Sequence, residues 1–160
     1  MMNENVTKRT ESARAYFLQG YGCAQSVLLA FSDLTGLDEK ASARLGSSFG
    51  GGMGRLREVC GGVTGAFAVL GFVCGYDDPT DKEGKSRHYA DIRELARRFS
   101  ERSRGNSIIC RELLGAKRAD NAPNPTPRDA EFYRTRPCAR FVGAAAELLE
   151  RYIAAHSSKS

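Results

Sequence analysis

Residues 57–74 read Arg-Glu-Val-Cys-Gly-Gly-Val-Thr-Gly-Ala-Phe-Ala-Val-Leu-Gly-Phe-Val-Cys, and we predict one helix over this most apolar stretch of the chain. Its small residues recur along one narrow seam, at Gly61, Gly65, Ala68 and Gly71 or Phe72. Each glycine lowers helix propensity by about 1 kcal/mol relative to alanine. Glycines that a helix contains despite this cost let the backbone of another helix approach closely, because they have no side chain. We therefore expect 57–74 to be the central, buried helix of the fold.

Several further segments have the apolar spacing of helices that bury one face. They span 5–19, 22–34, 39–49, 81–104 and 108–114, and a last helix begins at Pro137 and runs to about 155. Gly20 and Gly36 are placed to end the first two of these helices, and Asp38 is placed to cap the third. No strand-like alternation of useful length and no internal repeat is present.

These patterns predict an all-α fold made of one domain over residues 1–160. We expect a bundle of about six helices around the central glycine-rich helix, with an ordered core over 5–155. Residues 116–137 hold four of the five prolines and are predicted to form a long irregular connection.

The charge of the chain is moderately basic. Lys and Arg number 24 and Asp and Glu 19, a net charge of +5, and residues 81–104 hold eight of the basic residues and five of the acidic ones. The apolar stripe of this segment consists of Tyr89, Ile92, Ala96 and Phe99. Glu94 and Arg98 are four residues apart, as in exposed helical ion pairs. Mixed charges without a nucleic-acid motif indicate a solvated helix face, so we do not expect nucleic-acid binding.

Two features favour the reducing cytoplasm. The first nine residues are polar and no apolar run follows them, unlike a secretory signal peptide. The apolar run at 59–73 is too short and too rich in glycine to span a bilayer, so we expect no membrane insertion. Persistent disulfides are rare in the cytoplasm, and a chain of this length does not need them to fold. The cysteines therefore need another explanation.

The five cysteines are Cys23, Cys60, Cys74, Cys110 and Cys138, and none lies in a C-x-x-C pair. All but Cys74 fall in or near the first turn of a predicted helix. About 21 Å of helix separates Cys74 from Cys60, so these two cannot share a disulfide or a metal. A helix start favours the thiolate, which attacks disulfides and binds metals. As the alternative, free cysteines are small apolar residues that pack in cores, and we assign Cys74 to that class.

Three stretches resemble one known family. They are Tyr21-Gly22-Cys23-Ala24-Gln25, Phe49-Gly50-Gly51-Gly52-Met53-Gly54-Arg55 and Glu58-Val59-Cys60-Gly61-Gly62-Val63-Thr64-Gly65. They are similar to the redox-active family named from its cysteine pattern, C-GCAxxG-C-C, and Cys110 and Cys138 match its two remaining cysteines in order. The resemblance covers roughly 13–149. The sequence departs from the family pattern at Gly62, where the family has alanine, and glycine keeps this position small. Cys74 matches none of the family's four cysteines. The resemblance implies a redox protein and leaves the substrate undefined.

The leading hypothesis is thiol–disulfide chemistry by four cysteines: Cys23, Cys60, Cys110 and Cys138. The chain would then be a thiol-based oxidoreductase whose partner is a redox protein or a small thiol. Cys60, beside Arg57 and at a helix start, is the candidate attacking thiolate, and a second cysteine resolves the intermediate. Cys110 and Cys138 could form the other pair, but four cysteines permit three pairings.

Two further hypotheses stay open. The same four cysteines could hold zinc or an iron–sulfur cluster, since four thiolates suit either; His88 and His156 are poorly placed to add to them. Alternatively, a small anion could bind the backbone amides of the glycine loop beside Arg55. The loop glycines concerned are Gly51, Gly52 and Gly54. The lysine of a Walker pattern is absent, so a nucleotide is not implied.

Overall fold

The computed structural model describes residues 7–115, 120 and 122–157. Within them the chain forms α-helices, two short 3₁₀ segments and no strand, so the predicted all-α class is confirmed. The helices are α1 (Lys8–Leu18), α2 (Cys23–Ala30), α3 (Ser32–Thr35), α4 (Glu39–Gly46), α5 (Gly61–Cys74), α6 (Lys82–Arg102), α7 (Cys110–Leu114), α8 (Ala130–Thr135) and α9 (Cys138–Ser157), and the 3₁₀ segments are η1 (Ser47–Phe49) and η2 (Arg104–Asn106). Residues 5 and 6, where the first helix and the ordered core were predicted to begin, lie outside the described residues.

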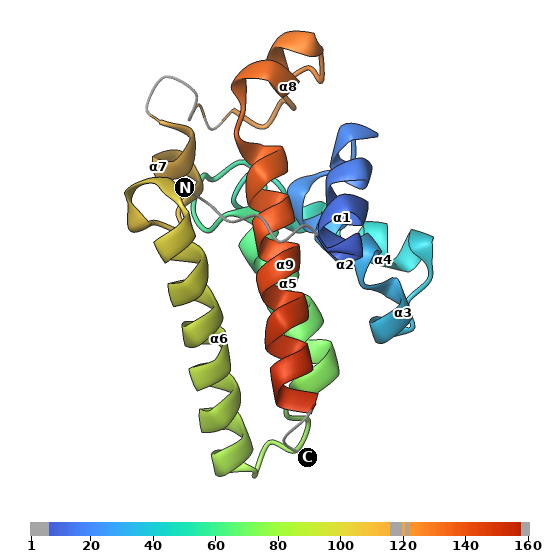
Figure 1. Cartoon of the computed structure of the whole chain (residues 1–160), viewed down its shortest axis with the longest axis vertical. Coiled ribbons are helices and arrows are strands. Elements are labelled where there is room, and N and C mark those ends of the chain that lie inside the picture. Colours follow the sequence, from blue (N-terminus) through green and yellow to red (C-terminus); the bar gives the residue numbers. More distant parts are fainter. Residues whose placement is uncertain (1–6, 116–119, 121, 158–160) are drawn as a thin grey trace.

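Three long helices, α5, α6 and α9, run side by side along the molecule (Figure 1). α9 packs against α1, α2, α5 and α6, and the shorter helices α1 to α4 lie on the side away from α6. α7, α8 and the start of α9 gather at one end of the long helices (Figure 1). That end joins segments that are far apart in the sequence, and four of the five cysteines lie there.

The glycine seam of α5 faces the start of α2. A Cβ atom on Gly61 would lie 2.9 Å from the Cβ atom of Cys23, and one on Gly65 would lie 3.0 Å from the Cα atom of Ala24. No side chain fits between the two backbones at Gly61 and Gly65, as the seam predicted, whereas a Cβ on Gly71 would meet only the side chain of His88, at 3.7 Å. The last three residues of the helix, from Phe72 to Cys74, are exposed, so the helix is not buried along its whole length.

Gly36 and Asp38 bound helices as predicted, but the helices beside them are shorter than predicted. The helix expected at 22–34 is divided at Phe31 into α2 and α3, and Gly36 ends α3 in a left-handed conformation with φ +70°. Asp38 caps α4 as predicted, because its carboxylate accepts a 2.7 Å hydrogen bond from the amide of Ala41. η1 continues the last turn of α4 in the tighter 3₁₀ geometry that helix ends often adopt.

The proline-rich connection contains a helix that sequence reasoning missed. α8 lies within 116–137, and Asp129 starts it by accepting a 2.8 Å hydrogen bond from the amide of Phe132. Pro137 then precedes α9, a position where its missing amide hydrogen does no harm. The connection is therefore partly helical, and α8 lies at the end of the bundle where α9 begins (Figure 1). Residues 116–119 and 121 of the connection lie outside the described residues.

The charged segment 81–104 forms α6, and its buried face differs from the predicted stripe. Leu95 and Phe99 are buried, whereas 53% of Tyr89 is exposed, so the predicted placement of Tyr89 in the core was wrong. The predicted pair of Glu94 with Arg98 is present at 2.8 Å.

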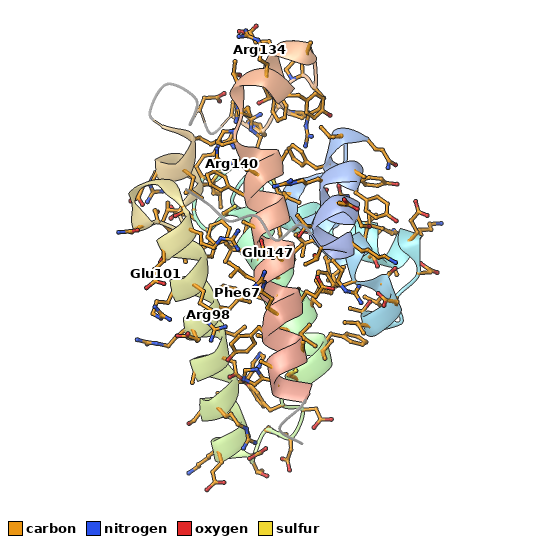
Figure 2. The ribbon with its side chains drawn as sticks, viewed as in Figure 1. Phe67, Arg98, Glu101, Arg134, Arg140 and Glu147 are labelled. Carbon is orange, nitrogen blue, oxygen red and sulfur yellow. The ribbon has the colours of Figure 1, made fainter. Side chains whose placement is uncertain are left out.

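α6 and α9 are also joined by an ion pair between them. Glu147 of α9, labelled in Figure 2, is buried. Its carboxylate lies 2.9 Å from the guanidinium of Arg102 of α6. Since a carboxylate is rarely buried without a cation beside it, this pair fixes how the two helices face one another. No helix in the described part of the chain is both long and apolar enough to cross a membrane.

Candidate thiol site at four helix starts

Four of the five thiols line one cavity of about 420 Å³ at the end of the bundle. Cys23, Cys110 and Cys138 are the first residues of α2, α7 and α9, and Cys60 immediately precedes α5. Each therefore lies at a helix start, as the sequence predicted. The other predicted site residues line the same cavity: Gly51, Gly52, Gly54 and Arg55. The structure thus brings the cysteines and the glycine loop, which separate hypotheses invoked, into a single site.

Cys74 lies apart from this site, at the last residue of α5, and its side chain is exposed. Its assignment to the buried apolar cysteines was therefore wrong. Cys74 and Cys60 lie at opposite ends of α5, which agrees with the expectation that they do not share a site.

A short antiparallel pairing places Cys60 beside Cys110. Val59 and Ile109 form an isolated β-bridge, and the amide of Cys60 donates a 2.8 Å hydrogen bond to the carbonyl of Ile108. This pairing holds the backbone before α5 extended, which is why α5 starts at Gly61 and not at residue 57.

Local capping groups set the start of α2, and with it the position of Cys23. The amide of Gly22 donates a 2.8 Å hydrogen bond to the side-chain oxygen of Gln25, and the hydroxyl of Ser26 donates back to the Gly22 carbonyl at 2.8 Å. On the far side of the cavity, Cys138 follows α8 and Pro137. Cys23 and Cys138 line the same cavity and are close enough that each shifts the pKa of the other.

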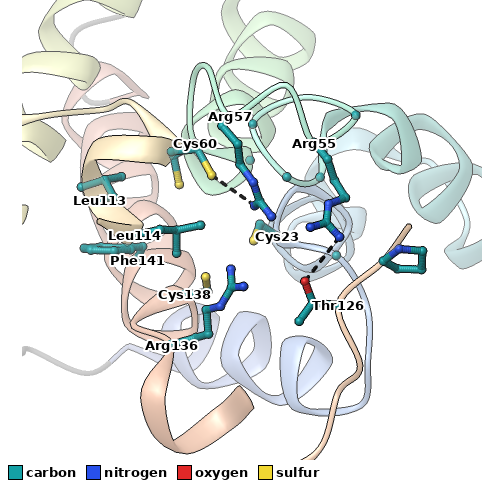
Figure 3. Close-up of a pocket in the computed structure, with 18 of the residues that line it drawn as sticks. Cys23, Arg55, Arg57, Cys60, Leu113, Leu114, Thr126, Arg136, Cys138 and Phe141 are labelled. Atoms are coloured by element: carbon teal, nitrogen blue, oxygen red, sulfur yellow. Dashed lines mark hydrogen bonds between the residues drawn. The ribbon is translucent and has the colours of Figure 1, made fainter. Parts of the chain in front are cut away.

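The glycine loop has a backbone that few residues adopt. Gly52 and Gly54 have φ of +65° and +56°, and the non-glycine residues Arg55 and Arg57 also have φ of +66° and +61°. Left-handed non-glycine residues are uncommon, and they concentrate at functional sites. Here they turn two arginine side chains toward the cavity from one side (Figure 3). Gly52 has a further role, because a Cβ on it would lie 2.5 Å from the Cβ of Cys110.

The arginines that line the cavity are Arg55, Arg57, Arg128 and Arg136. Among the described residues, no Asp or Glu lines it. Arg57 is only 6% exposed, and it donates hydrogen bonds to the carbonyl of Asp120 at 2.9 Å and to the sulfur of Cys110 at 3.6 Å. Arg136 enters from the opposite side, next to Cys138 (Figure 3). The thiols therefore sit in a strongly positive enclosure.

Sequence reasoning did not find Arg128 and Arg136. Both lie in 116–137, which was predicted to be irregular. The guanidinium of Arg128 stacks 4.3 Å from the ring centre of Phe17 and donates hydrogen bonds to the carbonyls of Phe17 at 3.3 Å and Tyr21 at 3.2 Å. Arg128 thus ties the connection to the turn before Cys23. The only signals for these residues were the place of Arg136 before Pro137 and that of Arg128 after Pro127, which do not distinguish them from other surface arginines.

The environment separates the four thiols by acidity. The interaction with the Cys23 thiol, together with the charges of Arg136, Arg128 and Arg57, lowers the pKa of Cys138 to about 7. The interaction with Cys138, together with burial, raises the pKa of Cys23. Burial raises the pKa of Cys60 to about 12 and also raises that of Cys110, although Arg57 opposes the shift at Cys110. The helix start alone therefore does not give Cys60 the low pKa that we expected, and Cys138 is the acidic thiol.

The four thiols do not form a metal site in this arrangement. Among the described residues, no three cysteine, histidine or carboxylate side chains are grouped closely enough to hold a metal ion.

The acidity of Cys138 gives a testable pH dependence. A lowered pKa means that the thiolate is present above about pH 7 and is lost as the pH falls through that value. We expect the rate of Cys138 alkylation by iodoacetamide to rise through a midpoint near pH 7, while Cys60 stays unreactive at that pH. Peptide mass spectrometry of pulse-labelled protein measures both rates. A Cys138 midpoint at the ordinary cysteine value of about 8.5 would contradict this assignment.

Comparison with known proteins adds one finding. Residues 21–152 match a family model described as "Putative redox-active protein (C_GCAxxG_C_C)". Neither a curated protein nor a solved structure gives a significant match. The matched residues include all four cavity cysteines and the glycine loop, as the resemblance in the sequence indicated. The chain belongs to the C_GCAxxG_C_C family.

Proposed function

We propose that the chain is a thiol-based oxidoreductase in which Cys138 attacks a substrate disulfide and Cys23 resolves the intermediate. The observation that carries this proposal is the placement of Cys23 and Cys138 in one cavity lined by arginines, where each thiol shifts the pKa of the other. The pKa of Cys138 is lowered and that of Cys23 is raised, which gives the thiolate and the protonated thiol that successive thiol–disulfide exchanges require. The positive charge of Arg136 further supports a thiolate on Cys138.

The chemistry balances in two exchanges. In the first, the Cys138 thiolate attacks one substrate sulfur, the substrate S–S bond breaks, and a mixed disulfide forms as the other substrate sulfur leaves as a thiolate. The Cys23 thiol then gives its proton to that leaving thiolate and attacks the Cys138 sulfur. The second substrate sulfur leaves, and the Cys23–Cys138 disulfide forms. The two protein thiols are oxidised, and the substrate disulfide is reduced by two electrons.

This assignment replaces the pairing in which Cys60 attacks. The pKa of Cys60 is raised to about 12 by burial, and Arg57 contacts the sulfur of Cys110 and not that of Cys60. Cys60 and Cys110 adjoin each other on the antiparallel pairing, which supports a role as a second, less reactive pair. In a reducing cytoplasm, a redox protein or a small thiol would return the oxidised pair to its dithiol state.

Redox titration with disulfide mapping tests the proposal. Reduced protein, purified without oxygen, is equilibrated with mixtures of reduced and oxidised dithiothreitol, alkylated, and analysed by peptide mass spectrometry. We expect a reversible Cys23–Cys138 disulfide with one midpoint potential, and Cys74 that remains fully alkylated throughout. Formation of a different pair, or of none, would refute the assignment. Thiols that resist alkylation until a chelator is added would instead identify Cys23, Cys60, Cys110 and Cys138 as ligands of zinc or a cluster.

A further inference from the structure

The cavity carries more positive charge than the thiol chemistry needs. One arginine beside a thiolate is enough to lower its pKa, whereas Arg55, Arg57, Arg128 and Arg136 all line this enclosure. No carboxylate lines the cavity among the described residues, and Asp120, which is largely exposed, lies 3.1 Å from Arg55. Because guanidinium groups bind carboxylates and similar anions through charge-assisted hydrogen bonds, a lining with this many arginines suits anionic groups of a ligand.

These arginines do not all have the same task. Arg128 is occupied in the fold, through its aromatic stack and two carbonyl hydrogen bonds. Arg55 contacts the connection through Thr126 at 3.3 Å, yet its Nε atom is buried with no hydrogen-bond partner among the described residues. An unsatisfied buried donor is rare in proteins and often marks a site that a ligand completes.

The positions of the charges indicate the shape of that ligand. Figure 3 shows Arg55 and Arg57 entering from the glycine loop and Arg136 entering from the opposite side, with the sulfurs of Cys23 and Cys138 between them. A ligand with an anionic group at each end and a disulfide in the middle matches this order. The rest of the lining includes apolar side chains that suit short hydrocarbon arms: Phe17, Leu113, Leu114, Phe132 and Phe141.

The size of the cavity favours a small molecule over a folded protein. Its volume of about 420 Å³ lies within the usual range of small-ligand sites, and Cys60 and Cys110 at its base are buried. We infer that the substrate of this site is a small disulfide that carries a carboxylate or similar anion on each arm. This inference rests on the proposed thiol–disulfide function and specifies its substrate class.

Three small disulfides of matched length test the inference, because they differ mainly in charge. They are 3,3′-dithiodipropionate, which is dianionic, bis(2-hydroxyethyl) disulfide, which is neutral, and cystamine, which is dicationic. Each oxidation rate of the reduced protein is divided by the rate of the same disulfide with free 2-mercaptoethanol, which removes the effect of leaving-group acidity. We expect the dianion to exceed the neutral compound, and the neutral compound to exceed the dication, by roughly tenfold or more at low salt. Added salt should reduce both ratios.

Variants assign the selectivity to the cavity. Arg55→Gln should lower the ratio of dianion rate to neutral rate at least fivefold, Arg55→Lys should retain most of it, and Arg97→Gln on exposed α6 should leave it unchanged. Suberate, which resembles dithiodipropionate with two methylenes in place of the sulfurs, should slow the alkylation of Cys138 by neutral iodoacetamide without any redox step.

The outcomes separate this inference from the proposed function. If the neutral disulfide oxidises the Cys23–Cys138 pair and the dianion shows no advantage, the substrate class is wrong and the thiol function stands. If no disulfide oxidises the pair, the function falls. In that case protection of Cys138 by suberate would still support an anion site, and its absence would remove both ideas.

Discussion

In a Cys74→Ser background, which removes the exposed thiol, replacing Cys138 with serine should lower the rate at which the reduced protein cleaves a small disulfide by a few hundredfold at pH 7, with Cys60 as the remaining nucleophile. Cys138 has a pKa of about 7, so about half of it is thiolate at that pH, whereas Cys60, with a pKa of about 12, is thiolate in roughly one molecule in 10⁵. The more basic Cys60 thiolate is intrinsically the better nucleophile, with a Brønsted coefficient of about 0.4–0.5. The thiolate of Cys60 is nearly five orders of magnitude scarcer than that of Cys138, and its higher nucleophilicity offsets roughly two of them. The expected loss of a few hundredfold remains.

Two matched variants make this result specific. Cys74→Ser removes an exposed thiol outside the cavity and should leave the rate unchanged. Cys23→Ser should leave the attacking sulfur but remove the resolving one, so the mixed disulfide between Cys138 and substrate should accumulate and be visible by intact mass. The Cys23→Ser variant also cannot form the Cys23–Cys138 disulfide, and a single-turnover assay shows directly whether that disulfide forms. A loss of less than tenfold in Cys138→Ser, with a comparable loss in Cys60→Ser, would transfer the attacking role to Cys60.

The position of the four cysteines at helix starts followed from local signals in the sequence. Gly22 precedes Cys23, Pro137 precedes Cys138, and the glycine loop precedes Cys60. Glycine and proline restrict the backbone within one or two residues of themselves, so their effect can be read without knowledge of the fold. The same holds for Asp38, whose cap depends on a neighbour three residues away.

The identity of the acidic thiol could not be predicted in this way. Arg57 is close to Cys60 in the sequence, and this proximity suggested that it activates Cys60. In the structure Arg57 has φ +61°, and its side chain reaches the sulfur of Cys110, which comes from a distant segment. The pKa of each thiol depends on burial and on partners brought together by the tertiary fold, and neither has a local signature.

The connection 116–137 shows the same limit at the level of secondary structure. α8 has six residues and lies between prolines, too short for a periodic apolar pattern to stand out. Arg128 and Arg136 flank this helix and line the cavity. The arginines were therefore not predicted for the same reason as the helix, which is that this short segment has no recognisable apolar pattern. The glycine loop and the cysteines were treated as rival sites because nothing in the sequence indicates that both face one cavity.

Replacing Gly52 with alanine should reduce the free energy of unfolding by about 2–5 kcal/mol. A left-handed conformation costs a non-glycine residue about 1–2 kcal/mol, and Gly52 has φ +65°. The added Cβ would also lie 2.5 Å from the Cβ of Cys110 and 3.0 Å from the carbonyl oxygen of Glu58, and such overpacking typically costs about 1–3 kcal/mol. Since domains of this kind are stable by about 5–15 kcal/mol, the loss is readily measured by urea unfolding of the reduced protein.

Gly54→Ala is the matched control, because it separates the backbone from the contact. Gly54 has a similar φ of +56°, but a Cβ there would meet nothing within 4 Å. Only the backbone contribution of about 1–2 kcal/mol should therefore be lost. The difference between the two variants measures how tightly the loop is packed on Cys110, and the alkylation rate of Cys110 should rise in Gly52→Ala alone, as the loop moves away from the sulfur. Equal losses of stability in both variants, with Cys110 unchanged, would mean that the loop yields to the extra carbon and does not hold this thiol in place.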